Sequence, residues 1–369
     1  MPTNPWPSDA LAATDIRTCD ARAEIERCRG ILAWLDAIPA DELLRTTPPP
    51  LDADLISVVV PMYNARRWID ACLKGLLAQT HVNQEIFCVD DASEDDTYTH
   101  LVERFGADKR ICAIRLGATV GPYQIKNWVI GSLARGHWIA LQDADDVSHP
   151  LRLQAQCEWM RATGQRVSGT CAHQFFPAGI SHPLGRGGAV EHGGVRHNLA
   201  FFPSLEPTFD RSPHDARPEQ RAGTEFWPAC RSGPYKVYQR VLADHGTQMM
   251  QRSLVLEFGG FDGRTRVAGD SDFNARVIRF HAIGNLPTVL YSRRFHADSL
   301  TQHPATDLAS AQRQDYRARR ALGETAIDAA LAEGNVDRAR ELCTADLYSG
   351  DVVVREMRSG FPIAEPACR

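Results

Sequence analysis

Lysine is scarce in this chain of 369 residues, and an excess of positive charge is missing altogether. Only four of the 41 basic side chains are lysines, and 46 acidic side chains bring the formal net charge to −5. A dedicated nucleic-acid-binding domain carries the opposite balance, with a basic surface and a pI above about 9. The sequence pI near 6.2 therefore predicts that the chain has no nucleic-acid partner.

Long apolar runs and paired cysteines are absent as well. No stretch approaches the ~20 apolar residues that a membrane-spanning helix needs. The first seven residues contain three prolines, and they show neither the basic start nor the apolar core of a signal peptide. None of the ten cysteines forms a C-x-x-C pair, so no zinc site is indicated. We therefore expect a cytoplasmic protein without a transmembrane segment, with peripheral association with a membrane left open.

The glycine-rich loops that cradle phosphates are also missing. No G-x-G-x-x-G follows a predicted strand, and no G-x-x-x-x-G-K-[ST] occurs anywhere in the chain. This absence disfavours hydride transfer with a dinucleotide and hydrolysis by a P-loop enzyme. A diphosphate that is bridged by a metal and held by carboxylates fits the sequence better.

The chain does contain a regular alternation of strands and helices. Four apolar runs predict strands, at residues 55–60, 85–89, 110–116 and 137–141. Amphipathic stretches predict the intervening helices, at residues 65–79, 95–105 and 122–134. Strands that alternate with helices of this length form βαβ units. The predicted fold class is therefore α/β, with a doubly wound and mostly parallel sheet.

The sequence divides into three expected parts. Residues 1–50 form a helical extension that ends in a proline linker, residues 51–303 form the α/β domain, and residues 304–369 form a second helical extension. Periodicity weakens and glycines and prolines accumulate between residues 173 and 235. Long irregular segments in compact domains are usually functional loops, so we interpret this stretch as an acceptor-binding or lid region.

Carboxylates follow two of the predicted strands directly. Asp90 and Asp91 come after the second strand, and Asp143, Asp145 and Asp146 come after the fourth. Ligands of open α/β sheets bind at this edge. Like charges that crowd together favour a cation among them. Because no histidine or cysteine pairs accompany these carboxylates, the predicted metal is Mg²⁺ or Mn²⁺.

A series of motifs in this order resembles the family 2 glycosyltransferases of the GT-A fold. The motifs are Pro61-x-Tyr63-Asn64, Val89-Asp90-Asp91-x-Ser93, Gly121 with Lys126-Asn127, Asp143-x-Asp145-Asp146, Gly259-Gly260-Phe261-Asp262, Asp270-Ser271-Asp272-Phe273 and Arg294-x-His296. The resemblance covers about residues 54–303. It implies an inverting enzyme that moves a sugar from a nucleotide-diphosphate sugar, expected to be a UDP-sugar, to a carbohydrate, lipid-linked or other hydroxyl acceptor. Polysaccharide or glycoconjugate synthesis is the setting that the resemblance implies.

The resemblance also implies a donor site. Asp91 is expected to read the nucleotide base, with Pro61, Tyr63 and Asn64 beside it, and Lys126 is expected near the phosphates. Another interpretation of Asp91 is that it caps the following helix, because acidic residues stabilise helix N-termini. Lys126 has a plainer alternative as a surface lysine on an amphipathic helix.

Metal and ribose contacts are implied for the acidic motif. Asp143 and Asp145 are expected to contact the ribose and the diphosphate, and Asp145, Asp146 and His296 are the expected metal ligands. A cation placed there would stabilise the charge that develops on the departing diphosphate. Which of Asp145 and Asp146 binds the metal directly is left open.

The expected general base is Asp270. Relatives usually carry a Glu-Asp pair about eight residues after the Gly-Gly-Phe-Asp turn, and here Gly269 replaces the glutamate while the aspartate is present. A carboxylate at this position would remove the proton from the acceptor hydroxyl. Asp272 is expected to favour the start of the helix, and Asp272 and Asp262 are the next candidates for the base.

Two other functions are consistent with parts of the pattern. A nucleotidyltransferase also gathers carboxylates at strand ends, but it would need a basic, glycine-rich loop after the first strand, which is absent here. A non-catalytic sugar-nucleotide-binding or scaffold module would tolerate loss of the acidic motif or of Asp270, and both are present. The helical extensions could serve as a docking surface for a protein partner or a membrane under any of these readings.

Overall fold

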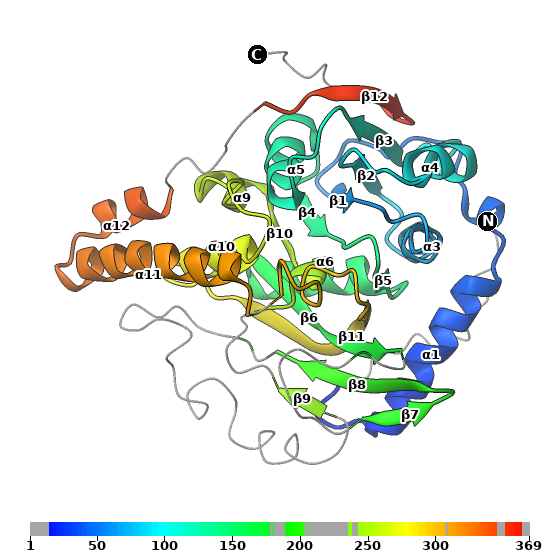
Figure 1. Ribbon diagram of the computed structural model, residues 1–369, viewed down its shortest axis with the longest axis horizontal. Helices are drawn as coiled ribbons and strands as arrows, with labels where there is room; N and C mark the ends of the chain where they lie inside the picture. The colour runs from blue at the N-terminus through cyan, green and yellow to red at the C-terminus, as the bar shows by residue number, and fades with distance from the viewer. Residues whose placement is uncertain are drawn as a thin grey trace.

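The computed structural model describes residues 15–177, 180, 189–202, 204, 235–237, 243–307, 309–344 and 351–363. A central sheet runs through the molecule with helices on both of its faces (Figure 1). Its main path is β12-β3-β2-β1-β4-β10-β6-β11-β5, and β8 extends it from β6 toward β7 and β9. The predicted α/β fold class is confirmed.

The first half of the sheet follows the predicted βαβ order. Its strands are β1 (Ile56–Met62), β2 (Gln84–Asp90), β3 (Ile111–Leu116) and β4 (Trp138–Leu141), and all three pairings among them are parallel. The helices between them are α3 (Ile69–Leu77), α4 (Thr97–Phe105) and α5 (Pro122–Trp128), which continues into a π-turn, η1 (Val129–Leu133). This half is the doubly wound parallel sheet that the hydrophobic periodicity predicted.

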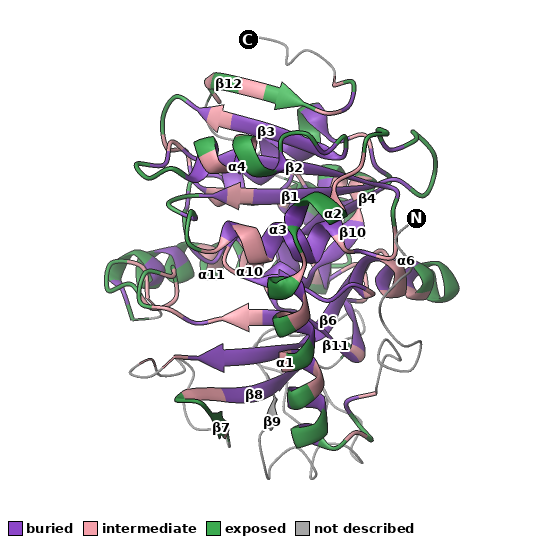
Figure 2. Cartoon of the chain, turned by 90° about the vertical axis from the view of Figure 1, so that its right-hand side faces the viewer, coloured by how far each residue is buried: buried purple, intermediate pink, exposed green. Residues whose placement is uncertain are grey.

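Both faces of this half are buried, which explains the continuous apolar runs of its strands. Along β1, Val58 and Val60 join one hydrophobic cluster, under α3 and α4. Val59 points the opposite way and joins Phe87 and Val89 in the second cluster, under α5 and the later helices. Figure 2 shows the central strands buried along most of their length. The edge they form with their carboxyl ends is therefore rigidly placed.

The second half of the sheet is mixed rather than mostly parallel. It contains β5 (Val147–Ser148), β6 (Val167–Phe176), β10 (Met249–Gln251) and β11 (Gly284–Arg294), with the helices α6 (Arg152–Thr163), α9 (Arg252–Glu257) and α10 (Gly269–Val277) and the short 3-10 turn η2 (His245–Thr247). Strand β10 runs antiparallel to both β4 and β6, whereas β11 is parallel to β6. The antiparallel insertion of β10 ends the βαβ pattern.

The stretch that was predicted to be irregular, residues 173–235, contains strands in its described part. The end of β6 lies in it, followed by β7 (Val190–His192), β8 (Val195–Phe201) and the first residue of β9 (Tyr235–Val237). The sequence did not predict strand β6, because buried polar side chains such as His173 and Gln174 interrupt the run of apolar residues that marks a buried strand. The acceptor-binding or lid interpretation applies mainly to residues that lie outside the described ranges.

Both extensions pack on the α/β domain. The N-terminal extension forms α1 (Ala21–Ala37) and α2 (Ala40–Leu43), and Ile25 and Cys28 of α1 pack against β6, β8 and β11. The C-terminal extension forms α11 (Ala311–Ala332) and α12 (Val336–Cys343), helical as predicted. It also supplies β12 (Val354–Ser359), which pairs antiparallel with β3 at the edge of the sheet. In the described parts of the chain, no helix is long and apolar enough to cross a membrane.

Candidate active site

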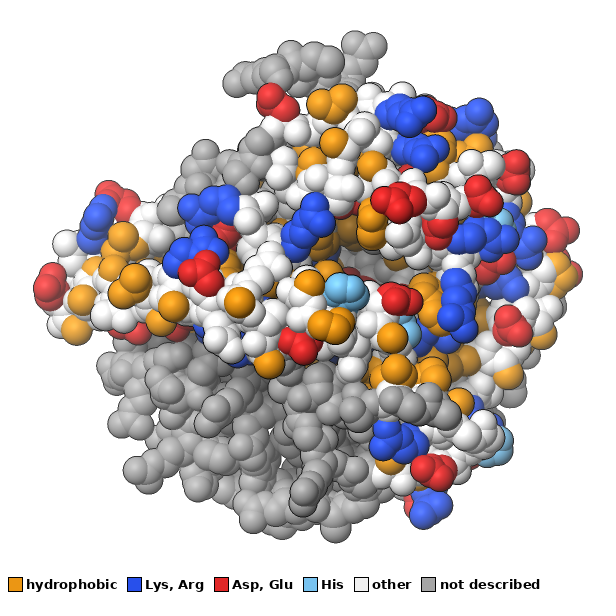
Figure 3. All heavy atoms as spheres, viewed as in Figure 1, with side chains coloured by type: hydrophobic (Ala, Val, Ile, Leu, Met, Phe, Trp, Pro, Cys, Tyr) orange, Lys and Arg blue, Asp and Glu red, His pale blue; other side chains and the backbone are white. Residues whose placement is uncertain are grey.

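A cavity of about 630 Å³ opens at the carboxyl ends of β1 and β4. On the face shown in Figure 3, a hollow is bordered by acidic, basic and histidine side chains. The cavity has the size of a small-molecule site. Its lining includes all the residues that the sequence predicted for the site, namely Pro61, Tyr63, Asn64, Asp91, Lys126, Asp143, Asp145, Asp146, Asp270 and His296. The structure thus brings together residues that are up to 235 positions apart in the sequence, from Pro61 to His296.

The residues after β1 form one rim of the cavity. Tyr63 is 51% exposed, which leaves its ring free to contact a ligand. Asn64 adopts a left-handed backbone conformation, with φ of 49°. Its backbone N–H donates to Ser93 Oγ over 2.9 Å, and its side-chain oxygen accepts from the Glu94 backbone N–H, also over 2.9 Å. Asn64 therefore joins the loops that follow β1 and β2.

Asp91 holds the start of α5. Its carboxylate accepts from the backbone N–H of Val120 at 2.7 Å and of Gly121 at 2.9 Å. Burial raises the pKa of this carboxyl, although the two backbone hydrogen bonds and Arg266 act in the opposite direction. The alternative interpretation, that Asp91 caps α4, is wrong, because Asp91 makes these bonds to the segment before α5 instead.

The acidic motif after β4 divides into two roles. Asp145 Oδ2 lies 2.8 Å from His296 Nε2, and its side chain is 27% exposed in the cavity. Asp146 is 2% exposed and accepts from the backbone N–H of Arg294 at 2.7 Å. Burial, with Asp145 and Asp143 nearby, raises the pKa of Asp146 well above its usual range. Asp146 thus holds the end of β11 in place, while Asp145 is exposed to the cavity.

The donor set around Asp145 fits a hard divalent cation only in part. In the described ranges, no group of three or more His, Cys, Asp or Glu side chains is arranged to hold a metal ion. Mg²⁺ is usually bound by one or two carboxylates together with substrate phosphates and waters. Asp145 and His296 would hold the ion, and phosphate oxygens of a ligand would complete its coordination. The residues present therefore fit a metal that arrives with a diphosphate.

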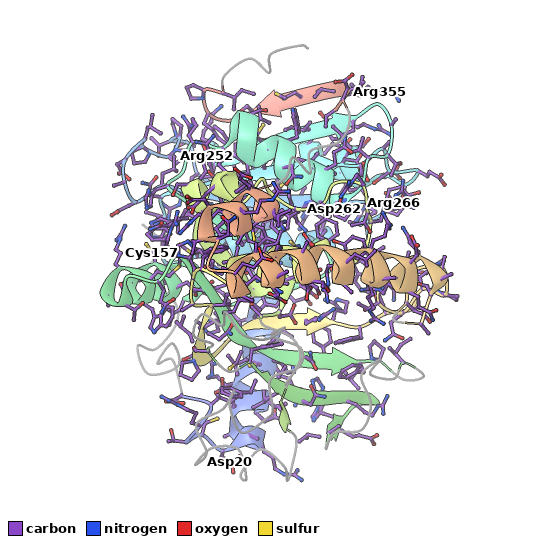
Figure 4. The ribbon with its side chains drawn as sticks, turned by 90° about the vertical axis from the view of Figure 1, so that its left-hand side faces the viewer. Asp20, Cys157, Arg252, Asp262, Arg266 and Arg355 are labelled. Carbon is purple, nitrogen blue, oxygen red and sulfur yellow. The ribbon has the colours of Figure 1, made fainter. Side chains whose placement is uncertain are left out.

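Asp270 lies on the first turn of α10 and lines the same cavity. Its Oδ1 accepts a hydrogen bond from the Tyr123 hydroxyl at 2.8 Å. The two other candidate bases are paired and lie outside the cavity lining. Asp262, on the segment before α10 (Figure 4), pairs with Arg264 at 2.8 Å, and Asp272 pairs with Arg276 at 2.9 Å.

Charges around Asp270 keep its carboxyl ionised. Burial alone would raise its pKa, but His245, the Tyr123 hydroxyl, Arg313 and Lys126 together outweigh burial and lower it. At neutral pH His245 is uncharged, since burial and Lys126 lower its pKa to about 4. At neutral pH, the groups that still favour the ionised form of Asp270 are therefore the Tyr123 hydroxyl, Arg313 and Lys126.

Lys126 is buried, which excludes its interpretation as a surface lysine. It is 2% exposed, and its Nζ lies 2.5 Å from Nε2 of His245. Burial lowers the pKa of its ammonium group, against the opposing effect of Asp143 and Asp270. Lys126 reaches the cavity from α5, and the negative charges of Asp143 and Asp270 both act on its ammonium group. Such a buried cation is suited to an anionic ligand.

Three polar residues that surround Asp270 are among the lining residues that sequence reasoning missed. Tyr123, His245 and Arg313 all line the cavity, and Arg313 comes from α11 in the C-terminal extension. Tyr123 had a signal in the sequence, because it follows Gly121 within one of the recognised motifs. His245 and Arg313 had none, since a lone histidine and one arginine among many give no pattern. Their places depend on how η2 and α11 pack.

The family comparison covers the first half of the α/β domain. Residues 57–188 match the model described as glycosyl transferase family 2. A Haemophilus influenzae protein named an uncharacterized glycosyltransferase is 38% identical over 96 residues, which are 26% of this chain and 29% of that protein. An Escherichia coli protein, UDP-Glc:alpha-D-GlcNAc-diphosphoundecaprenol beta-1,3-glucosyltransferase WfgD, is 32% identical over 110 residues, 30% of this chain and 42% of that protein. The chain spans less than half the length of either relative.

Among solved structures, the chain is similar to a mannosyltransferase from Pyrobaculum calidifontis in complex with GDP-Man and Mn²⁺. That likeness has a TM-score of 0.46 and 14% identity, and it covers 93% of this chain and 87% of the other. S. aureus TarS, residues 1–349 in complex with UDP, is similar at a TM-score of 0.44 and 15% identity, over 84% of this chain and 99% of the other.

Proposed function

We propose that this chain is an inverting glycosyltransferase, because residues 57–188 match the model described as glycosyl transferase family 2. The donor is a nucleotide-diphosphate sugar, and a UDP-sugar is the specific proposal. The acceptor is a hydroxyl of a carbohydrate or of a lipid-linked sugar, in polysaccharide or glycoconjugate synthesis. The name of the similar E. coli protein, which pairs UDP-glucose with a diphosphoundecaprenol-linked sugar, supports this choice of donor and acceptor.

One observation carries the proposal. One cavity is lined by Asp270, whose pKa is lowered, by the Asp145–His296 pair and by the buried Lys126. A transferase needs both a base for the acceptor and positive charge for the leaving diphosphate. A scaffold or binding module needs no general base, and it has no need for an ionised carboxylate such as that of Asp270.

The donor side is proposed to form from β1, β2 and α5. Tyr63 and Pro61 line the part of the cavity where the nucleotide base is proposed to lie. Asp91 accepts hydrogen bonds from Val120 and Gly121 and so fixes the loop that borders this part. Lys126 supplies a fixed positive charge for the phosphates. A buried cation is expensive to leave unpaired, so an anionic ligand gains from filling this place.

A divalent cation, Mn²⁺ or Mg²⁺, is proposed to be held by Asp145 and His296. When bound there, it would offset the negative charge that accumulates on the departing diphosphate. Asp143, two residues before Asp145, also lines the cavity and is proposed to contact the ribose. Asp146 is proposed to support the site through Arg294 rather than to bind the ion, because its carboxylate is already engaged there.

In the proposed reaction, Asp270 removes the proton from the acceptor hydroxyl. The hydroxyl oxygen forms a bond to the anomeric carbon, and the bond from that carbon to the diphosphate oxygen breaks with its electron pair leaving on the nucleoside diphosphate. Lys126 opposes the charge that appears on the leaving group. Attack from the face opposite the leaving group inverts the anomeric configuration.

Calorimetric titration with UDP tests the donor and metal parts together. With Mn²⁺ present, we expect UDP to bind at least tenfold more tightly than with a chelator present. Asp145→Ala should abolish most of the metal effect, whereas Asp272→Asn, a carboxylate outside the cavity, should preserve it. Equal affinity with and without the metal would contradict the metal assignment, and no binding of UDP in either condition would contradict the choice of nucleotide.

A further inference from the structure

We propose that Tyr123 is a positioning residue that orients the Asp270 carboxylate, and that glycine at position 269 is required to make room for its ring. This inference rests on the proposed function only in that Asp270 acts as the base there. Neither the family comparison nor the sequence motifs assign a role to Tyr123. The inference comes from three observations on the described residues, which concern the hydrogen bond, the ring and the glycine.

The hydrogen bond joins two helices that are far apart in the sequence. Tyr123 Oη, from the first turn of α5, donates to Asp270 Oδ1 of α10 over 2.8 Å. A hydroxyl that donates to a carboxylate makes one of the stronger hydrogen bonds in proteins. With Oδ1 held by the phenol, Oδ2 is the oxygen left for a proton from the acceptor. The geometry of the base is thereby set by a second side chain.

The ring of Tyr123 is itself held in place. Tyr123 is 6% exposed, and its ring lies 5.9 Å from that of Phe261 and 5.7 Å from that of His245, measured between centroids. The helix that carries it starts at Gly121, whose backbone N–H is bound by Asp91. A side chain with two rotatable bonds and neighbours on several sides keeps its hydroxyl in one place. Tyr123 can therefore impose an orientation on Asp270.

Gly269 allows the ring to lie where it does. A Cβ atom at position 269 would lie 2.9 Å from Tyr123 Cδ2 and 3.0 Å from Cγ, closer than real Cβ contacts allow. The backbone at this position has an ordinary negative φ, so conformational freedom is not the reason for glycine. The space above Gly269 is occupied by the tyrosine ring. Any larger residue at 269 would displace either the ring or the first turn of α10.

Glycine at position 269 leaves the space beside Asp270 to the ring of Tyr123, so the side chains that fit at positions 123 and 269 depend on each other. The phenol gives Asp270 a neutral hydrogen-bond donor. Lys126 of α5 and Arg313 of α11 also face Asp270 and act on it through their charge, whereas His245 of η2 carries a charge only below about pH 4.

The first test is Tyr123→Phe, which removes only the hydroxyl. The titration of Asp270 is followed by the ¹³C signal of its carboxyl group, assigned with Asp270→Asn. We expect the midpoint to move to higher pH in Tyr123→Phe, because the hydrogen bond that favours the ionised form is lost. Tyr98→Phe is the matched control, since Tyr98 is also buried, lies outside the cavity lining and has no hydrogen-bond partner for its hydroxyl. An unchanged midpoint in Tyr123→Phe would overturn the proposal.

Turnover is measured in parallel as the release of UDP from UDP-glucose and from UDP-N-acetylglucosamine, with water as the acceptor and Mn²⁺ present. We expect kcat to fall roughly 10- to 100-fold in Tyr123→Phe, the usual cost of misplacing a reacting group, with UDP affinity unchanged. The acidic limb of the pH profile should move with the Asp270 midpoint. A fall in kcat with an unmoved acidic limb would show a merely structural role and overturn the proposal.

The pairing of the two positions is tested by Gly269→Ala. We expect this substitution alone to lower kcat about as much as Tyr123→Phe does. In a Tyr123→Ala background, where the ring is gone, Gly269→Ala should cause no further loss, which is the non-additivity expected of residues in contact. Additive losses in the double variant would contradict the pairing. If Gly269→Ala fails to fold, Tyr123→Phe alone still decides the proposal.

Failure of the proposed function would look different. If the wild-type chain releases UDP from neither probe, then the transferase proposal is the one in question. The carboxyl titration would still report whether Tyr123 controls Asp270, because it requires no turnover. A shifted midpoint together with normal kcat in Tyr123→Phe would contradict the positioning role and leave the transferase proposal intact.

Discussion

Three aspartates close together in the sequence differ in what they contact, and this difference decides which of them can act as a base. Asp262 and Asp272 are paired with arginines, so their charge is already neutralised. Asp270 has a phenol as its hydrogen-bond partner and faces the cavity. A carboxylate that is ionised but not paired with an arginine can still accept a proton. At the residue scale, the proposed base is therefore Asp270, together with the groups that hold it.

Asp270→Asn is the direct test of the base. Asparagine keeps the shape of the side chain but cannot take up the acceptor's proton, so we expect transfer to fall by ~10²–10⁴. UDP and metal binding should be retained, since those contacts come from other elements. Asp272→Asn, which loses only its bond to Arg276, should keep most of the activity. Loss of donor affinity that equals the loss of rate would instead make Asp270 a donor-binding residue.

Asp91 is expected to matter both for stability and for the ligand. Asp91→Ala leaves the backbone N–H groups of Val120 and Gly121 without their acceptor, so the free energy of unfolding should fall by about 1–3 kcal/mol. UDP affinity should fall as well, because this loop borders the cavity. Asp95→Ala is a suitable comparison, because Asp95 accepts from the backbone N–H groups of Thr97 and Arg66 and all three residues lie outside the cavity lining, so its loss should affect mainly stability. Normal UDP affinity in Asp91→Ala, measured by calorimetry, would contradict its place in the donor site.

At the scale of elements, α11 is attached to the domain by a buried arginine. Arg279, which follows α10 and is fully buried, pairs with Asp328 of α11 at 2.8 Å. The same helix carries Arg313, which lines the cavity near its N-terminal end. The C-terminal extension is therefore a part of the site, and its attachment should affect the position of Arg313.

Asp328→Ala is expected to destabilise the chain more than a similar change on the exposed side of α11. Removing Asp328 leaves the charge of Arg279 buried, and because Asp328 is about one-third exposed we expect a loss of ~1–2 kcal/mol rather than the larger cost of a fully buried pair. Asp315→Ala breaks the exposed pair with Arg319 and should cost less than about 1 kcal/mol. Urea unfolding of both variants compares the two losses, and equal losses would mean that the Arg279–Asp328 pair does not anchor α11.

Across the whole molecule, buried histidines make stability depend on pH. His173, which is fully buried, lies 2.9 Å from His197 and 3.1 Å from the Ser292 hydroxyl, and burial lowers its pKa to about 3. The unfolded chain takes up this proton near the ordinary histidine pKa of about 6.5. The unfolded state therefore binds more protons between those two values, and stability must fall as the pH falls through this window.

His173→Gln is expected to reduce this acid sensitivity. Each such histidine contributes a slope of about 1.4 kcal/mol per pH unit, so the variant should lose stability less steeply than the wild type below about pH 6.5. Carboxyls with raised pKa, such as Asp146, act with the opposite sign, so the quantity to compare is the difference between the two proteins. Denaturant unfolding at a series of pH values gives this difference. A difference that is constant with pH would contradict the buried, neutral state of His173.

The sequence alone determined the parallel half of the sheet and ten of the residues that line the cavity. Val58, Val59 and Val60 predict a strand buried on both faces, and carboxylates placed directly after such strands must meet at one edge of a parallel sheet. Local patterns of this kind carry the needed information, because period and position within a strand follow from adjacent residues. The helical part of the C-terminal extension was predicted for the same reason.

The tertiary structure decided what the local patterns could not. The mixed half of the sheet depends on β10 pairing between β4 and β6, and no pattern within Met249–Gln251 specifies its neighbours. The division between Asp145 and Asp146 depends on Arg294, and the fit of Tyr123 over Gly269 depends on α5 meeting α10. These contacts join residues about 150 positions apart. Such pairings are set by packing of the whole chain, and a single sequence carries no local signal for them.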